Sequence, residues 1–173
     1  MTVTNEQISK VAQTGIQNVV HIAAACNKTG CPFYLAVAMI ERESRGRNVY
    51  GHDSGGALSG FDKTVNQGNF EVFEWLVFDQ KHTSNGVGPA QLTWPGFFTD
   101  MGKQGLKPWV PADNILYGVR LLYGYYKQAR KTKGVRDSIV AAGKDYNGAQ
   151  SYGEGLLQQA LKWKDTLGGA DYA

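Results

Sequence analysis

Apolar residues recur at helical spacing over the first part of the chain and then fill almost every position of a second segment. Over residues 5–27 the apolar positions follow a period near that of an α-helix, which predicts one long amphipathic helix with a single core-facing stripe. Residues 32–44 hold hardly any polar side chain before the last turn. Because a helix that is apolar on nearly all sides is buried, this segment is predicted to be a central helix.

The pattern changes over residues 46–105, where glycine and other turn-forming residues become frequent. The chain has 22 glycines, and they concentrate in this region. Glycine permits tight turns but weakens helices and strands, so we expect a small loop or strand–turn insertion between two helical halves. Within it, the aromatic and β-branched run at residues 70–78 fits either a strand or a short helix.

Helical patterns return in the second half of the chain. Four helices are expected, at residues 95–105, 111–133, 135–146 and 152–167. The tail at about residues 168–173 should fray. Neither a repeat nor a linker interrupts the chain. The sequence therefore predicts a single domain over residues 1–173, of the α+β class but mainly α.

Composition and charge narrow the class of protein. A hydrophobic share of 42% with 19% charged residues is typical of a folded domain. The net charge of +3 is mild, and the basic residues are scattered except at residues 127–133, which argues against a nucleic-acid binder. The N-terminus carries no signal-peptide pattern and no apolar run is long enough to cross a bilayer. We therefore expect synthesis in the cytoplasm and no membrane insertion.

Cysteine and histidine usage predicts neither a metal site nor a cofactor. Cys26 and Cys31 are close enough in sequence for a disulfide, but two buried thiols suit a cytosolic product better. The three histidines show no ligand spacing.

Two carboxylates, Glu41 and Glu43, end the apolar segment at residues 33–43. Apolar neighbours and the negative end of the helix dipole both raise the pKa of a carboxyl group there, as a general acid requires. A surface pair balanced by Arg42 and Arg45 is the alternative. Both faces of this helix are apolar, so periodicity does not choose between the two glutamates.

Four short segments carry a further pattern. They are residues 38–46, which contain Glu43-Ser44; residues 86–92, with the sequence GVGPAQL; Asn114-Ile115 followed by Gly118; and Tyr146-Asn147-Gly148. In this order they resemble motifs of soluble lytic transglycosylases and goose-type lysozymes. The chain departs from the family at Leu121, where tyrosine is usual, and at Ala149, where a second glycine is usual. Residues 48–53 and 86–94 are most similar to lysozyme domains of endolysins from phages of actinobacteria.

The resemblance implies a lysozyme-like fold with a central buried catalytic helix, and it assigns roles to individual residues. Glu43 becomes the catalytic acid and Glu41 a neighbour that does not transfer the proton. Ser44 would orient Glu43 or the substrate, Gln91 and Tyr146 would contact the glycan or the acid, and Asn147 would hold its turn.

A second carboxylate decides the mechanism. Inversion by water needs one at a distance from the acid, and Asp53 and Asp62 are the candidates because both lie in the glycine-rich segment. Without one, the family alternative is lytic transglycosylation, in which the 6-hydroxyl of the substrate attacks. Among the aromatic residues of this region, Tyr50 and Trp94 are the ones expected in the cleft, since aromatic faces stack on sugars.

These observations predict a peptidoglycan glycosidase of the endolysin type, a muramidase or a lytic transglycosylase. It would cleave the β-1,4 bond between N-acetylmuramic acid and N-acetylglucosamine with Glu43 as general acid. The expected partner is the peptidoglycan strand, bound by a monomer that reaches the wall after the membrane opens. The alternative is a non-catalytic glycan-binding or virion structural module with the same fold.

Overall fold

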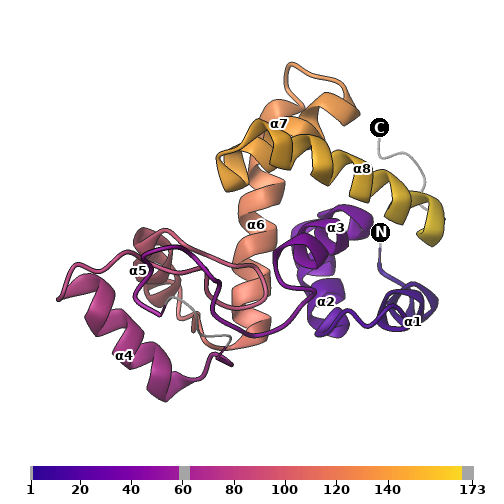
Figure 1. Cartoon of the computed structure of the whole chain (residues 1–173). Coiled ribbons are helices and arrows are strands. Elements are labelled where there is room, and N and C mark those ends of the chain that lie inside the picture. Colours follow the sequence, from indigo (N-terminus) through magenta and orange to yellow (C-terminus); the bar gives the residue numbers. More distant parts are fainter. Residues whose placement is uncertain (1, 59–62, 169–173) are drawn as a thin grey trace.

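The computed structural model describes residues 2–58 and 63–168, and over these residues the protein is mainly helical (Figure 1). This confirms the mainly α prediction. The described residues form eight α-helices: α1 Asn5–Ala12, α2 Val19–Thr29, α3 Phe33–Glu43, α4 Gln67–Phe78, α5 Pro95–Lys103, α6 Pro111–Ala129, α7 Val135–Asn147 and α8 Gln150–Leu167.

The first predicted helix is in fact two helices, α1 and α2, so the expectation of one helix over residues 5–27 was wrong. Between them Asn18 adopts a left-handed conformation and donates a hydrogen bond from Nδ2 to the Gly46 carbonyl at 2.8 Å. Gly46 packs so closely on this turn that a Cβ there would lie 2.1 Å from the Gln17 carbonyl oxygen. The break is therefore fixed by a tertiary contact with the end of α3, which helical periodicity does not reveal.

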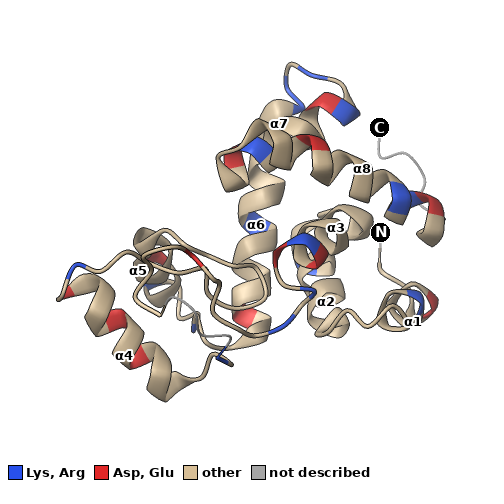
Figure 2. Cartoon of the chain, in the orientation of Figure 1, with Lys and Arg blue, Asp and Glu red and all other residues tan. Residues whose placement is uncertain are grey.

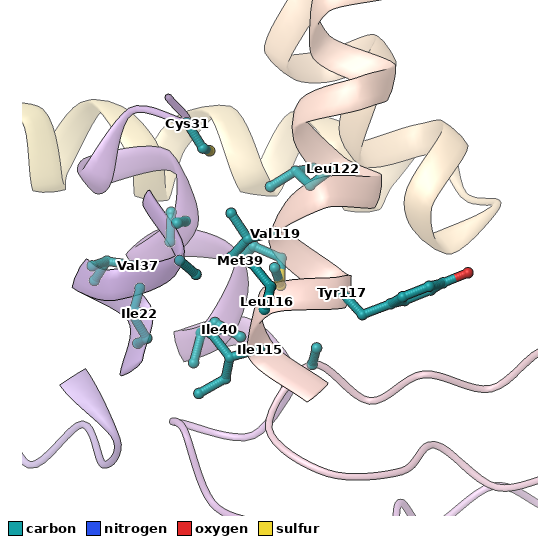
Figure 3. Close-up of a cluster of buried hydrophobic side chains, with 14 of the residues drawn as sticks. Ile22, Cys31, Val37, Met39, Ile40, Ile115, Leu116, Tyr117, Val119 and Leu122 are labelled. Carbon is teal, nitrogen blue, oxygen red and sulfur yellow. The ribbon is translucent and has the colours of Figure 1, made fainter. Parts of the chain in front are cut away.

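Helix α3 occupies the centre of the helical part, as predicted. Every residue from Phe33 to Ile40 is buried, and the helix packs against α2, α6 and α8. Figure 3 shows Met39 and Ile40 of α3 beside Ile115 and Val119 of α6. Cys26 and Cys31 are both free and buried, in agreement with the two-thiol interpretation.

The glycine-rich region contains one helix, α4, and otherwise irregular chain. The run at residues 70–78 belongs to α4, which begins with a capping box between Asn66 and Asn69 and buries Phe70 and Phe73. Of the two alternatives, a strand or a short helix, the run forms the helix. Its buried residues follow a helical spacing, so they lie on the one side of α4 that faces the core. Over the described residues, the predicted β component is limited to four isolated bridges.

The C-terminal helices follow the predicted order with small shifts of their ends. Helix α6 ends at Ala129, before the predicted residue 133, and α8 begins at Gln150, before the predicted residue 152. Gly168 caps α8, and the rest of the predicted frayed tail lies outside the described residues. Acidic and basic residues are interspersed over the chain, with a basic group in the turn between α6 and α7 (Figure 2). None of the helices in the described part is long and apolar enough to cross a membrane.

Candidate active site

A cavity of about 690 Å³ brings together residues from both halves of the chain. One group of lining residues, which we call the helical wall, comes from the end of α3, from α6 and from the end of α7. The second group, which we call the loop wall, is Asp53 together with residues of the segment 83–97. The helical wall consists of Glu43, Leu121, Tyr125, Asp145, Tyr146, Asn147 and Gly148, and the loop wall of Asp53, Thr83, Ser84, Gly86, Gln91, Leu92, Thr93, Trp94, Pro95 and Phe97.

Glu43 is the last residue of α3 and lines this cavity. The Tyr152 hydroxyl of α8 donates a hydrogen bond to Glu43 Oε1. Burial raises the pKa of the Glu43 carboxyl to about 7, against the opposing effects of the Tyr152 hydrogen bond and the Arg42 charge. The negative charge of Asp53 adds to the increase in pKa. Glu43 can therefore hold a proton close to neutral pH.

Glu41 does not line the cavity, although it lies only two residues earlier. Its carboxylate accepts hydrogen bonds from the Gln159 amide and, at 2.7 Å, from the Trp163 indole N–H. Arg45 Nη1 lies 3.7 Å from the other carboxylate oxygen of Glu41, Oε1. These contacts make Glu41 part of the packing between α3 and α8. The structure thus separates the two glutamates that the helical pattern could not rank.

Three helices each hold the loop at residues 86–92 through one side chain. Ser44, which follows α3, donates from Oγ to the Pro89 carbonyl at 2.8 Å. Asn114 of α6 accepts from the Ala90 N–H at 2.9 Å, and Tyr146 of α7 donates to the Ala90 carbonyl at 2.7 Å.

Helix α6 also approaches this loop closely. A Cβ at Gly118 would lie 2.4 Å from the Ala90 Cβ, so only glycine fits there. The four segments that carry the family resemblance are far apart in sequence, and here they meet at a single loop.

Gln91 adopts a left-handed conformation with φ of 47° at the end of this loop. Its amide nitrogen donates to the Val49 carbonyl at 2.9 Å and to the Gly88 carbonyl at 2.8 Å. Because both amide hydrogens are engaged, Gln91 can offer a ligand only its acceptor oxygen. A strained residue held by its surroundings is common at functional sites.

Comparisons with known protein families, curated proteins and solved structures found no match. The evidence that the four segments form one site is therefore the geometry of this chain.

Of the two predicted candidates for a second carboxylate, only Asp53 is among the residues that the structure describes. Asp53 lines the cavity, and its Oδ2 accepts a hydrogen bond from the Gly86 N–H at 2.7 Å. Asp62 lies outside the described residues. No group of three or more potential metal ligands occurs among the residues that the structure describes.

Two predicted substrate contacts need correction. Tyr50 is 0% exposed, its ring centre lies 5.3 Å from that of Phe73, and its hydroxyl donates to Asn69 Oδ1 at 3.1 Å. It is a core residue because the inner face of α4 packs on it. Ser44 is also buried, and its hydroxyl is engaged with Pro89, so it supports the loop and does not face a ligand.

The other predicted contacts line the cavity. Trp94 is 63% exposed and meets Phe97 edge to face at a centroid distance of 5.0 Å. Gln91, Tyr146 and Asn147 are lining residues as well. Tyr146 reaches the loop and not the acid: its hydroxyl bonds to Ala90, and burial together with the Glu43 charge raises its pKa.

Sequence reasoning missed Tyr152, the residue that contacts Glu43. Tyr152 lies near the start of α8, more than a hundred residues after Glu43 in the sequence, and no local pattern links the two residues. Glycines at positions 153 and 155 in a helical segment were a signal that something packs closely on α8, but they do not name the partner.

Proposed function

We propose that this protein is a glycosidase that cleaves the β-1,4 bond between N-acetylmuramic acid and N-acetylglucosamine in peptidoglycan. The observation that carries the proposal is Glu43, a carboxyl group with a pKa of about 7 in the wall of a cavity that also holds the exposed Trp94. A protonated carboxyl group can donate to the glycosidic oxygen, and an indole face can support a sugar ring. The lysozyme-like fold is part of the proposal, supported by the buried helix that ends in the acid and by the four converging segments.

Glu43 acts as the general acid. Tyr152 holds Oε1 by hydrogen bonding, so the proton of the neutral acid is carried by Oε2. In transglycosylation, once the leaving group has departed, the Glu43 carboxylate takes the proton of the substrate 6-hydroxyl as that oxygen attacks; in hydrolysis the proton of the attacking water goes to Asp53 instead. A pKa near 7 suits both steps, since an acid–base group works best when its pKa lies near the working pH.

Asp53 supplies a carboxylate on the loop wall of the cavity, opposite the helical wall that holds Glu43. The Gly86 N–H fixes one carboxylate oxygen and leaves the other able to accept a proton from water or to stabilise the oxocarbenium-like centre. In hydrolysis, Asp53 activates water and the product is a reducing sugar. In transglycosylation, the substrate 6-hydroxyl attacks and the product is a 1,6-anhydro sugar. Mass spectrometry of muropeptides released by wild type and by Asp53→Asn separates these reactions.

Lysis of purified cell walls tests the assignment of Glu43. We expect Glu43→Gln to clear a wall suspension about 10³-fold more slowly than wild type, because removing a general acid typically costs 10²–10⁴ in rate. Glu41→Gln is the matched control: it makes the same change two positions earlier, outside the cavity, and should retain activity.

Equal clearing by wild type and Glu43→Gln would show that Glu43 is not the acid. Binding of wall fragments by wild type without any lysis would favour the non-catalytic glycan-binding or virion structural module.

The proposed partner is the glycan strand, bound by a monomer of an endolysin type that meets the wall only once the membrane is opened. Fractionation of cells that express the chain alone should then leave it in the cytoplasmic fraction, with lysis following only when a membrane-opening protein is added.

A further inference from the structure

The end of α3 meets α8 through one tyrosine that touches two charged residues. Tyr152 donates its hydroxyl hydrogen to Glu43 Oε1. The guanidinium carbon of Arg42 lies 4.7 Å from the centre of the Tyr152 ring, in the range of a cation–π interaction. Arg42, Tyr152 and Glu43 thus form a connected group, with the tyrosine between a cation on its face and the carboxyl group at its hydroxyl.

Helix α8 has a place for the Arg42 side chain. Gly155 lies one turn after Tyr152, and a Cβ there would be 2.7 Å from Arg42 Nη1. Glycine inside a helix costs about 1 kcal/mol relative to alanine. The close approach of Arg42 gives a physical reason for a glycine at this position, so Arg42 has a defined seat against α8.

Packing alone does not explain a tyrosine at position 152. Phenylalanine would fill the same space, and a hydroxyl group in a partly buried position is favourable only when it is hydrogen-bonded. Tyr146, one of the tyrosines that line the cavity, donates its hydroxyl hydrogen to the Ala90 carbonyl and supports the loop. The Tyr152 hydroxyl has Glu43 as its acceptor, which links it to the acid.

We propose that Tyr152 is a positioning residue for Glu43 and that Arg42 holds Tyr152 in place. This inference rests on the proposed role of Glu43 as the acid. Tyr152 fixes the rotation of the carboxyl group and keeps the proton on Oε2. Arg42 polarises the tyrosine hydroxyl and adds a positive charge near the carboxylate.

The same two groups oppose the effect of burial. The Tyr152 hydrogen bond and the Arg42 charge both lower the pKa of Glu43, whereas burial raises it. Without them the carboxyl group would hold its proton to higher pH and would donate it less readily. Burial also raises the pKa of Tyr152 itself, and the Glu43 charge raises it further, so the tyrosine keeps its own proton and remains a donor.

Titration of the Glu43 carboxyl carbon by NMR, in wild type and in Tyr152→Phe, tests the inference directly. We expect the pKa of Glu43 to rise above the wild-type value of about 7. The basic limb of the pH–activity profile should move to higher pH by the same amount, and kcat should fall about 10- to 100-fold because the acid is no longer held in place. Tyr126→Phe, the same change in a buried tyrosine that does not line the cavity, is the matched control and should alter none of these three quantities.

Two changes at Arg42 separate charge from shape, and since this side chain is exposed, both variants should fold. Arg42→Gln removes the charge and should raise the pKa of Glu43, whereas Arg42→Lys keeps the charge and should restore most of the wild-type value. An unchanged pKa of Glu43 in both Tyr152→Phe and Arg42→Gln would overturn the inference. The NMR titration needs no substrate, so it gives its answer even if wild type fails to cleave walls, a result that would refute the proposed function alone.

Discussion

The two walls of the cavity differ in how far they depend on hydrogen bonds. The acid stands at the end of α3, whose preceding residues are packed among apolar side chains of α2, α6 and α8. The loop at residues 86–92, which carries Gly86, Gln91 and Leu92 of the loop wall, also buries apolar side chains, but it is held in addition by hydrogen bonds between helix side chains and its backbone at Pro89 and Ala90. Apolar packing tolerates changes of shape within limits, whereas each hydrogen bond of the loop wall needs one particular donor or acceptor. The loop wall should therefore be the more sensitive to single polar substitutions.

Replacement of Asn114 should give the largest effect. This fully buried side chain accepts from the Ala90 N–H and donates to the Val87 and Pro108 carbonyls. Asn114→Leu keeps the volume but leaves these backbone groups unpaired, at about 1–3 kcal/mol for each. We expect a loss of about 4 kcal/mol in the free energy of unfolding, measured by chemical denaturation, together with loss of wall lysis.

The matched control is Ser138→Ala, another fully buried polar residue. Its hydroxyl bonds to the Gly134 carbonyl of its own helix, so the expected cost is only about 1 kcal/mol. Equal destabilisation by the two variants would mean that the loop wall does not depend on its cross-links to the helices.

The second prediction uses the buried acid of the helical wall. The pKa of Glu43 is raised from its ordinary value of 4.5 to about 7 in the folded protein. Below pH 4.5 the folded and unfolded states are both protonated; as pH rises to 7, only the unfolded state ionises, and wild type loses stability.

Glu43→Gln removes this titration. It should match wild type at pH 4 and be more stable by up to about 3 kcal/mol at pH 8. Denaturant titrations at the two pH values measure the difference, and a constant difference would mean that the pKa of Glu43 is the same in the folded and unfolded states.

How far the sequence could predict the fold depends on whether a feature arises within one segment or from a contact between distant segments. The apolar run at residues 33–40 predicted the burial of α3, because one segment carries the whole signal. The break before α2 depends on Gly46 packing on Gln17, and the burial of Tyr50 depends on α4. Such contacts join distant segments and leave no periodicity to read.

The candidate site divides in a similar way. The family motifs pointed to Glu43, Gln91 and Tyr146, and all three line one cavity. The motifs did not predict what each side chain does there: Tyr146 holds the loop, and Tyr152 from outside the motifs contacts the acid. These roles follow from the packing of α3 and α7 against α8, which the sequence does not specify residue by residue.

Two exposed tryptophans allow a third prediction, about binding alone. Trp94 lines the cavity, whereas Trp75 lies on α4 and is 52% exposed away from it. Trp94→Ala in a Glu43→Gln background should weaken the binding of soluble glycan fragments about tenfold, about 1.4 kcal/mol, with little change in stability. Trp75→Ala should leave affinity unchanged. Calorimetric titration compares the two variants, and equal effects would remove Trp94 from the proposed glycan site.

The smallest expected effect tests the seat of Arg42 against α8. A methyl group at Gly155 would come within 2.7 Å of Arg42 Nη1, and the end of this flexible side chain can move aside. Alanine also favours the helix by up to about 1 kcal/mol over glycine, which offsets the cost of the displacement. Gly155→Ala should therefore change the free energy of unfolding by less than about 1 kcal/mol. It should still raise the pKa of Glu43, since Arg42 moves away from Tyr152. An altered stability with an unchanged pKa of Glu43 would show that the glycine serves only the packing of α8 and that the seat of Arg42 does not affect the acid.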